Sequence, residues 1–135
     1  MEKQFVVDIY TPTGHYLKTN ADYLSVTTGL GVVGILPNHA PLITTIEISK
    51  LTIKFNGADM VFAVSNGFMR IKKGTHVVLM VNAIERDNEI DIDRAYASKE
   101  RAENRLNDKN EDADVARAKA SLARALNRIS IYEKK

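Results

Sequence analysis

The stretch "NEIDIDRAYASKERAENRL", Asn88 to Leu106, marks the point where the composition of the chain changes. All seven glycines, all three prolines and all nine threonines lie at or before Thr75. The segment from Ile90 to Lys135 contains none of them, yet it holds 11 Lys/Arg and 9 Asp/Glu, against 8 of each in the rest of the chain. Gly, Pro and Thr favour turns and strands over helices. The shift therefore predicts two domains, residues 1–88 and 89–135.

The first domain has the pattern of short strands. Segments rich in Val, Ile, Thr and aromatic residues alternate with Gly and Pro, at residues 4–12, 22–28, 48–57, 59–74 and 75–85. Short strands with no helix-length pattern between them predict an antiparallel β-sandwich or barrel. Asn56-Gly57 predicts a tight hairpin turn, and Asn66-Gly67 predicts a second position with positive φ.

The second domain has the pattern of two helices. Asp91 is placed to cap the first helix, with Asp93 in its first turn, and the helix is expected to run to about Leu106. A turn over residues 107–114 follows. The fold class predicted for the whole chain is therefore α+β, a β-sandwich followed by an antiparallel helical hairpin.

The second helix is expected to open at Asp112 or Asp114 and to end near Tyr132. Apolar residues recur along it at spacings of three and four, as Val115, Ala118, Leu122, Ala125 and Ile129. This stripe is narrow and rich in alanine, so it buries little apolar area. The hairpin is therefore expected to be marginally stable, and a partner or ligand would move it with a few kcal/mol.

Several classes of function find no support in the composition. A net charge of +2 gives no sign of a nucleic-acid or membrane-surface partner, and the lack of cysteine excludes disulfides and thiolate metal sites. No apolar run approaches a membrane span, and the start "MEKQFVVDIYTP" lacks a signal-peptide pattern, so a soluble protein is expected.

Catalytic and metal-binding motifs are likewise missing. His15, His39 and His76 are dispersed, with no Ser or Asp at a recognisable spacing, and no phosphate-binding glycine motif is present. The acids of the predicted turn lack the spacing of a calcium loop, so they are interpreted as turn and cap residues: Asp108, Glu111, Asp112 and Asp114. The prediction is no catalytic residue and no metal site.

Three arginines of the second helix, Arg117, Arg124 and Arg128, share one face at i, i+7 and i+11. The plain interpretation of such a charge run is a solvated face, and it is the more frequent one. The functional interpretation is a contact with an acidic partner or a phosphate, since guanidinium donates two parallel hydrogen bonds.

"IDIDRA", Ile90 to Ala95, also has two interpretations. Asp91 and Arg94 form a helix cap with a local ion pair, worth a few tenths of a kcal/mol. If the hairpin is antiparallel, they would also come close to Arg124 and Arg128. Carboxylate acceptors beside paired guanidiniums are what a nucleotide requires.

The segment "GVVGILPNHAPLIT", Gly31 to Thr44, is expected to be a rigid connection at a strand edge. Pro37 and Pro41 each fix φ and remove a backbone donor on either side of His39. Turn chemistry is sufficient to explain the prolines, and a lone exposed histidine requires no special role.

Four stretches together resemble the epsilon subunits of F-type ATP synthases: "VGILPNHAPLIT" (33–44), "AVSNGFMRIK" (63–72), "IDIDRA" (90–95) and "ARALNRI" (123–129). The resemblance covers essentially the full length of the chain. It implies a ten-stranded sandwich, a two-helix domain, and a noncatalytic central-stalk subunit that rotates with the gamma subunit.

The resemblance also implies the partners. The sandwich of such proteins docks on gamma and on the loops of the c-ring, where His39 matches a contact position. The helices either fold against the sandwich or extend along gamma, and the extended form inhibits ATP hydrolysis. In that form Arg117, Arg124 and Arg128 would meet an acidic segment of the beta subunit. The location implied is peripheral, at the cytoplasmic face of the membrane, with no direct membrane insertion.

In several bacilli, ATP bound to the folded hairpin favours the non-inhibitory form. The family motif [IL]DxxRA falls on "IDIDRA", an acidic position of the same site falls six residues before Asp91, and two arginines of the second helix close the site over the phosphates. The ATP contacts implied are Glu85, Ile90, Asp91, Arg94, Ala95, Arg124 and Arg128. ATP is thus expected as a regulatory ligand, and no cofactor is required.

The sequence departs from the family at Val32, where an acid is frequent, and at Asn38, where glycine is usual. A free-standing ATP-sensing module remains an alternative and would not co-purify with gamma. A nucleic-acid-binding module is disfavoured by the near-neutral charge and by the lack of aromatic stacking positions on the second helix.

Overall fold

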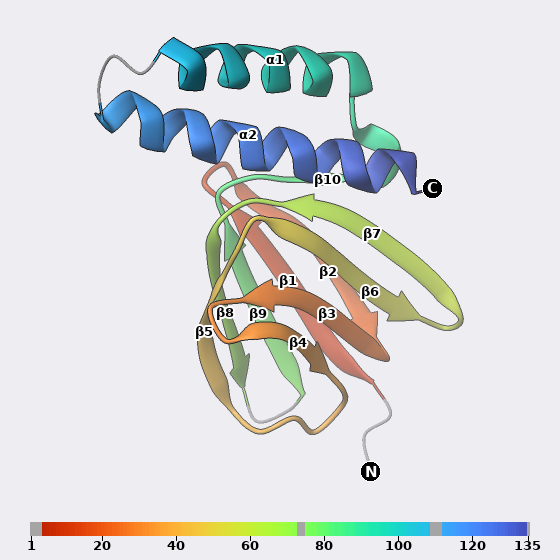
Figure 1. Ribbon diagram of the computed structural model, residues 1–135. Coiled ribbons are helices and arrows are strands. Elements are labelled where there is room, and N and C mark those ends of the chain that lie inside the picture. The colour runs from red at the N-terminus through yellow and green to blue at the C-terminus, as the bar shows by residue number, and fades with distance from the viewer. Residues whose placement is uncertain (1–3, 73–74, 109–111, 135) are drawn as a thin grey trace. The chain divides into compact units, whose positions relative to one another are not determined.

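The computed structural model describes residues 4–72, 75–108 and 112–134. These residues contain ten strands, one short 3-10 helix and two α-helices (Figure 1). The chain divides into two compact units, Met1–Arg86 and Asp87–Lys135, and each unit is described here by itself.

The first unit holds the strands. They are β1 (Phe5–Thr11), β2 (Gly14–Ala21), β3 (Tyr23–Thr28), β4 (Gly31–Ile35), β5 (Leu42–Ile46), β6 (Ser49–Phe55), β7 (Ala58–Val64), β8 (Gly67–Lys72), β9 (His76–Val81) and β10 (Ile84–Arg86). Their order is β10-β7-β6-β3-β5-β8-β9-β1-β2, with β4 paired to β3. The predicted sandwich and its ten strands are confirmed, although β1 and β9 run parallel.

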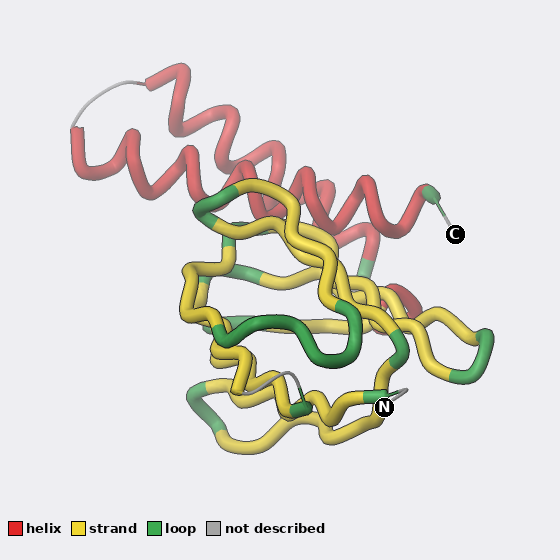
Figure 2. Tube along the Cα trace, turned by 90° about the horizontal axis from the view of Figure 1, so that it is seen from below, coloured by secondary structure: helices red, strands yellow, loops and turns green. Residues whose placement is uncertain are grey.

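The two ends of this strand order come together, which closes the sheet into a sandwich (Figures 1 and 2). The rings of Tyr16 on β2 and Phe62 on β7 meet edge to face, with their centroids 6.3 Å apart. Side chains alternate between the faces of a strand. On β1, therefore, Phe5, Val7 and Ile9 enter the core, where each is at most 1% exposed, while the residues between them belong to the outer face.

The two turn predictions had different outcomes. Asn56 and Gly57 join β6 to β7 with φ of 52° and 82°, so the predicted hairpin turn is confirmed. The prediction of positive φ at Gly67 is wrong, because its φ lies outside the left-handed region. Glycine is required there for another reason: a Cβ at Gly67 would collide with the backbone carbonyl of Met80 on the neighbouring β9.

Three strands lie where the sequence predicted none. β4 and β5 occupy most of the segment interpreted as a rigid connection, which is reduced to residues 36–41. β2 has a largely exposed, polar sequence, "GHYLKTNA", so it carries little of the apolar signal that marks a strand. The segments 59–74 and 75–85 each divide into two strands.

The second unit contains η1 (Asp87–Glu89), α1 (Ile92–Asp108) and α2 (Asp112–Glu133). Both helices extend slightly beyond the predicted bounds, so the connection is shorter than expected, and Glu111 lies outside the described residues. The helices pack side by side along their length (Figures 1 and 2). The predicted stripe is confirmed, since its members are buried or half-buried: Val115, Ala118, Leu122, Ala125 and Ile129.

Candidate functional site

The start of α1 is a capped helix terminus. The Asp91 carboxylate accepts a hydrogen bond from the backbone N–H of Arg94, at 3.1 Å, and its carbonyl accepts from the N–H of Ala95, at 3.0 Å. This is the geometry of an N-cap, which satisfies donors that the helix leaves unpaired. The predicted cap is confirmed. Asp91 and Arg94 are exposed, whereas Ile90 and Ala95 are buried.

The hairpin is antiparallel, as predicted. The Tyr96 hydroxyl donates a hydrogen bond of 2.7 Å to Oε1 of Glu133, which joins the first turns of α1 to the end of α2. This bond raises the pKa of Tyr96, because a phenolate would lose it and would face the Glu133 charge.

The same bond indicates the register of the two helices. Arg94 lies two residues before Tyr96, so its level is about two residues beyond Glu133. Measured along the hairpin axis from the level of Arg94, Arg128 is roughly seven residues away and Arg124 roughly eleven. At a rise of about 1.5 Å per residue, these separations are roughly 10 and 16 Å. Neither arginine is level with Arg94, so in this register the expected closeness of Arg94 to Arg124 and Arg128 is not present, and the three lie at successive levels along the hairpin.

The arginines of α2 differ in exposure. Arg117 is exposed, while Arg124 and Arg128 are half-buried. Nη2 of Arg124 donates to Oγ of Ser121, one turn earlier, at 3.1 Å. This contact fixes the direction of the guanidinium and leaves further donors for an acidic group. Glu85, the remaining residue of the implied ATP site, lies on β10 of the first unit and is half-buried there.

The loop between β4 and β5 carries His39. Nδ1 of this histidine donates a hydrogen bond of 2.7 Å to the backbone carbonyl oxygen of Ala40. Asn38 has a φ of 67°, a conformation that asparagine tolerates better than most residues other than glycine. The departure at Asn38 is therefore compatible with the turn. Val32, the other departure, is 77% exposed on β4.

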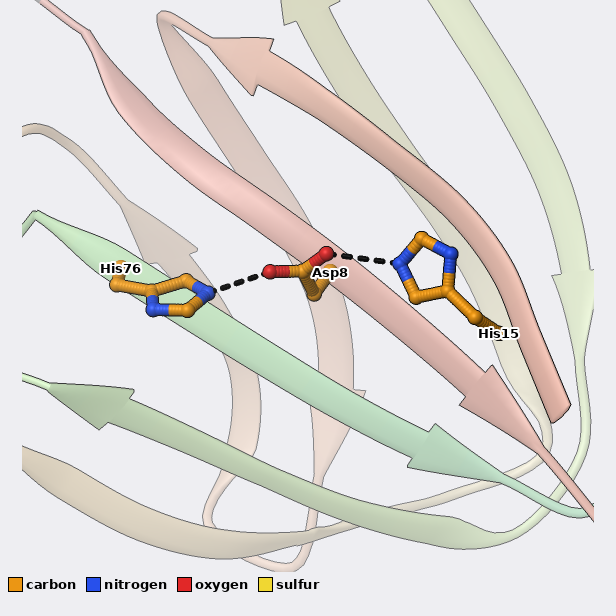
Figure 3. Close-up of polar contacts among 3 residues, drawn as sticks. All are labelled: Asp8, His15 and His76. Carbon is orange, nitrogen blue, oxygen red and sulfur yellow. Dashed lines mark hydrogen bonds and ion pairs between the residues drawn. The ribbon is translucent and has the colours of Figure 1, made fainter.

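The sequence reasoning missed a polar cluster on the outer face of the sandwich. Asp8 of β1 lies between a histidine on each neighbouring strand (Figure 3). Its Oδ1 is 2.8 Å from Nε2 of His15, and its Oδ2 is 2.6 Å from Nε2 of His76. The Asp8 side chain is only 9% exposed, while those of the histidines are 41% and 37% exposed.

The surroundings of Asp8 favour its charged form. The hydrogen bond from His15 lowers the pKa of Asp8, burial opposes this, and the contact with His76 and the charge of Lys18 lower it further. The carboxylate is therefore ionised at neutral pH and accepts from both Nε2–H groups. The short turn between β1 and β2 brings His15 back beside β1, so the closeness of His15 to Asp8 could have been predicted from the sequence. His76 lies 68 residues from Asp8, and no local signal could have found it.

The same outer face exposes large apolar side chains. Phe68 of β8 pairs in register with Met80 of β9, which pairs with Tyr10 of β1. One row further, Ile43 of β5 pairs with Arg70, which pairs with Val78. We call Tyr10, Ile43, Phe68, Val78 and Met80 the apolar face.

Four residues of the apolar face are exposed, namely Ile43 at 71%, Phe68 at 57%, Met80 at 56% and Tyr10 at 40%. A hollow of about 510 Å³ lies beside Tyr10, Phe68 and Met80. Contiguous exposed apolar side chains on a sheet indicate an interaction surface.

Two further observations concern the described part of the chain alone. Its residues form no group of three or more His, Asp or Glu that could hold a metal ion. None of its helices is both long and apolar enough to cross a membrane.

The chain belongs to a class of proteins that combine a β-sandwich with a C-terminal helical hairpin. Each of these two parts matches a known protein family. Residues 4–87 match the family model "ATP synthase, Delta/Epsilon chain, beta-sandwich domain", and residues 88–133 match "ATP synthase, Delta/Epsilon chain, long alpha-helix domain". The chain belongs to the family of ATP synthase delta/epsilon chains. Within that family it is similar to the bacterial epsilon chains.

The ATP synthase epsilon chain of Desulfitobacterium hafniense (strain Y51) is 40% identical over 106 residues, which cover 78% of this chain and 80% of that one. The epsilon chain of Desulforamulus reducens is 39% identical over 109 residues, 81% of this chain and 82% of that one.

Among solved structures, a chain of the Euglena gracilis mitochondrial ATP synthase has a TM-score of 0.82 at 17% identity, covering 91% of this chain and 78% of that one. A chain of the Tetrahymena thermophila mitochondrial ATP synthase central stalk and c-ring has a TM-score of 0.65 at 14% identity, covering 97% of both chains. At these identities the likeness concerns the fold.

Proposed function

We propose that the chain is the noncatalytic epsilon subunit in the central stalk of an F-type ATP synthase, where it couples the rotor to the catalytic head and restrains ATP hydrolysis. The observation that carries this proposal is the order and extent of the two family matches, which together cover residues 4–133. On this proposal the chain works as a peripheral part of the complex, at the cytoplasmic face of the membrane.

The apolar face is the surface proposed to dock on the gamma subunit. It exposes a phenylalanine, a methionine, a tyrosine and an isoleucine in adjacent rows, and aromatic residues and methionine are enriched at protein interfaces. The β4–β5 loop with His39 is proposed to meet the loops of the c-ring. Val32 would give that contact an apolar component where relatives frequently have an acid.

The hairpin is proposed to be the regulatory element. Its interface consists largely of alanine and a single apolar stripe, so a modest energy would open it. In the open form, Arg117, Arg124 and Arg128 would meet acids of the beta subunit. A ligand shifts such an equilibrium only by its different affinity for the two forms.

ATP is proposed as that ligand. The elongated strip formed by Asp91 and Arg94 at one end and by Arg128 and Arg124 further along suits a ligand whose base and phosphates lie at opposite ends. Ile90 and Ala95 would flank the base, Asp91 would accept its polar hydrogens, and the arginines would bind the phosphates.

The test is an ATP titration of the full chain by calorimetry, with the Arg124→Ala/Arg128→Ala double variant alongside. The proposal predicts micromolar-to-millimolar binding that the double variant loses, together with loss of inhibition in the assembled enzyme. Loss of only one of the two properties would show that the arginines do not serve both states. Binding of ATP without any association with gamma would favour a free-standing sensor.

A further inference from the structure

The charges around the apolar face are arranged unevenly. The rows that contain Ile43, Val78 and Val6 also carry the side chains of Lys18, Arg70, Lys72 and His76. His15 lies one row away, opposite Tyr10, and bonds back to Asp8. We call these four residues and His15 the basic half of the face. Lys18, Arg70 and Lys72 are exposed. An acid that borders the face, Glu47, lies at the opposite end, beside Phe68 and Met80.

One carboxylate lies within the basic half, and it is covered. Asp8 is only 9% exposed, and both of its oxygens accept hydrogen bonds from histidines. A partner therefore meets lysine, arginine and imidazole there rather than the carboxylate. At this end the surface also has a hollow of about 760 Å³ lined in part by Ile43, Arg70, Lys72 and His76. Acidic side chains of a partner fit such a hollow by charge.

The charge at the centre of the basic half depends on pH. With both imidazoles neutral, Asp8, His15 and His76 together carry −1, and with both protonated they carry +1. Histidine is the side chain whose charge ordinarily changes between about pH 5 and 8. The charged groups around the histidines are Asp8 on β1, Lys18 on β2, and Arg70 and Lys72 on β8.

We propose that the basic half binds acidic side chains of the stalk partner, and that this contact takes up protons at His15 and His76, so that docking strengthens as the pH falls. The inference rests on the proposed docking to gamma and adds the chemistry and the proton linkage of the contact. A positively charged imidazolium ring carries a proton on both nitrogens, so it donates Nε2–H to Asp8 and still has Nδ1–H to donate to the partner. Asp8 thereby holds each ring in place while the ring binds outward.

The experiment measures the affinity of the full chain for its own gamma subunit between pH 8 and pH 6, in low salt. The native chain is expected to bind about three- to tenfold more tightly at pH 6 than at pH 8, because a histidine pKa that rises by one unit on binding changes the affinity by up to about tenfold. The His15→Gln/His76→Gln variant keeps an amide donor for Asp8 but does not titrate. Its affinity is expected to be independent of pH and close to that of the native chain at pH 8.

A second pair of variants tests the sign of the partner's charge. Arg70→Glu/Lys72→Glu is expected to weaken binding by about tenfold or more and to remove most of its salt dependence. The matched control is Lys50→Glu, an exposed lysine of β6 outside the face, which is expected to leave affinity nearly unchanged.

The outcomes separate the two proposals. Binding that does not change with pH, or a pH dependence that persists in the double glutamine variant, would overturn the proton linkage alone. Unchanged affinity in the charge-reversal variant would overturn the acidic contact. No binding of native chain to gamma at any pH would overturn the docking itself.

Discussion

Asp8→Asn tests the polar cluster as a structural element. The native carboxylate accepts two hydrogen bonds, of 2.8 and 2.6 Å, from donors on β2 and β9, and so ties three adjacent strands together. A hydrogen bond to a charged group contributes about 1.5–3 kcal/mol. Both histidines also reach water, and asparagine keeps one oxygen acceptor, so the expected loss is about 1–3 kcal/mol of unfolding free energy at pH 7.

The assay is urea unfolding of the full chain, with the signal taken from strand content. Asp59→Asn is the matched control, because Asp59 is an exposed aspartate of β7, and it should change the unfolding free energy by less than about 0.5 kcal/mol. An Asp8→Asn variant as stable as the control would refute the structural role of the cluster.

The pH dependence gives the same reasoning a second test. The hydrogen bond from His15 lowers the pKa of Asp8 in the folded chain, so the folded state binds this proton more weakly than the unfolded state does. The contribution of the carboxylate is therefore present above the unfolded pKa of about 3.9 and is lost as the pH falls through the folded value. The difference between native chain and Asp8→Asn should close at low pH. A gap that stays constant down to pH 2 would contradict this.

Three further changes have defined outcomes. Asp91→Ala removes the cap of α1 and should destabilise that helix by about 1 kcal/mol, seen as a lower helical signal on heating; unchanged melting would count against the cap. Phe68→Ser combined with Met80→Ser should weaken association with gamma by about tenfold or more while stability is kept, because both side chains are over half exposed; equal affinity would mean that another face docks. Tyr96→Phe removes the hydrogen bond to Glu133, so amide exchange should speed up in the first turns of α1 and the last turn of α2, and unchanged exchange would show that this bond does not hold the hairpin.

What the sequence predicted correctly depended on local physics. The cap at Asp91 and the turn at Asn56-Gly57 involve residues within four positions of one another, and both are present. The helical character of the segment from Ile90 onward followed from its lack of Gly, Pro and Thr.

What the sequence could not predict depends on strand pairing. The need for glycine at Gly67 comes from β9, and the second partner of Asp8 comes from a parallel strand 68 residues away. β2 and β4 carry exposed or polar sequences, and only their pairing with β1 and β3 identifies them as strands. The apolar face is equally non-local, because Ile43, Phe68, Met80 and Tyr10 come from four strands.

The most direct test of the central proposal is the rate of ATP hydrolysis by the catalytic head of its own ATP synthase, depleted of the epsilon subunit and supplied with the purified chain. The proposal predicts that the native chain lowers the rate, that high ATP relieves this inhibition, and that Arg124→Ala/Arg128→Ala inhibits less. A hydrolysis rate that the native chain leaves unchanged at low ATP, under conditions where it binds gamma, would contradict the regulatory role.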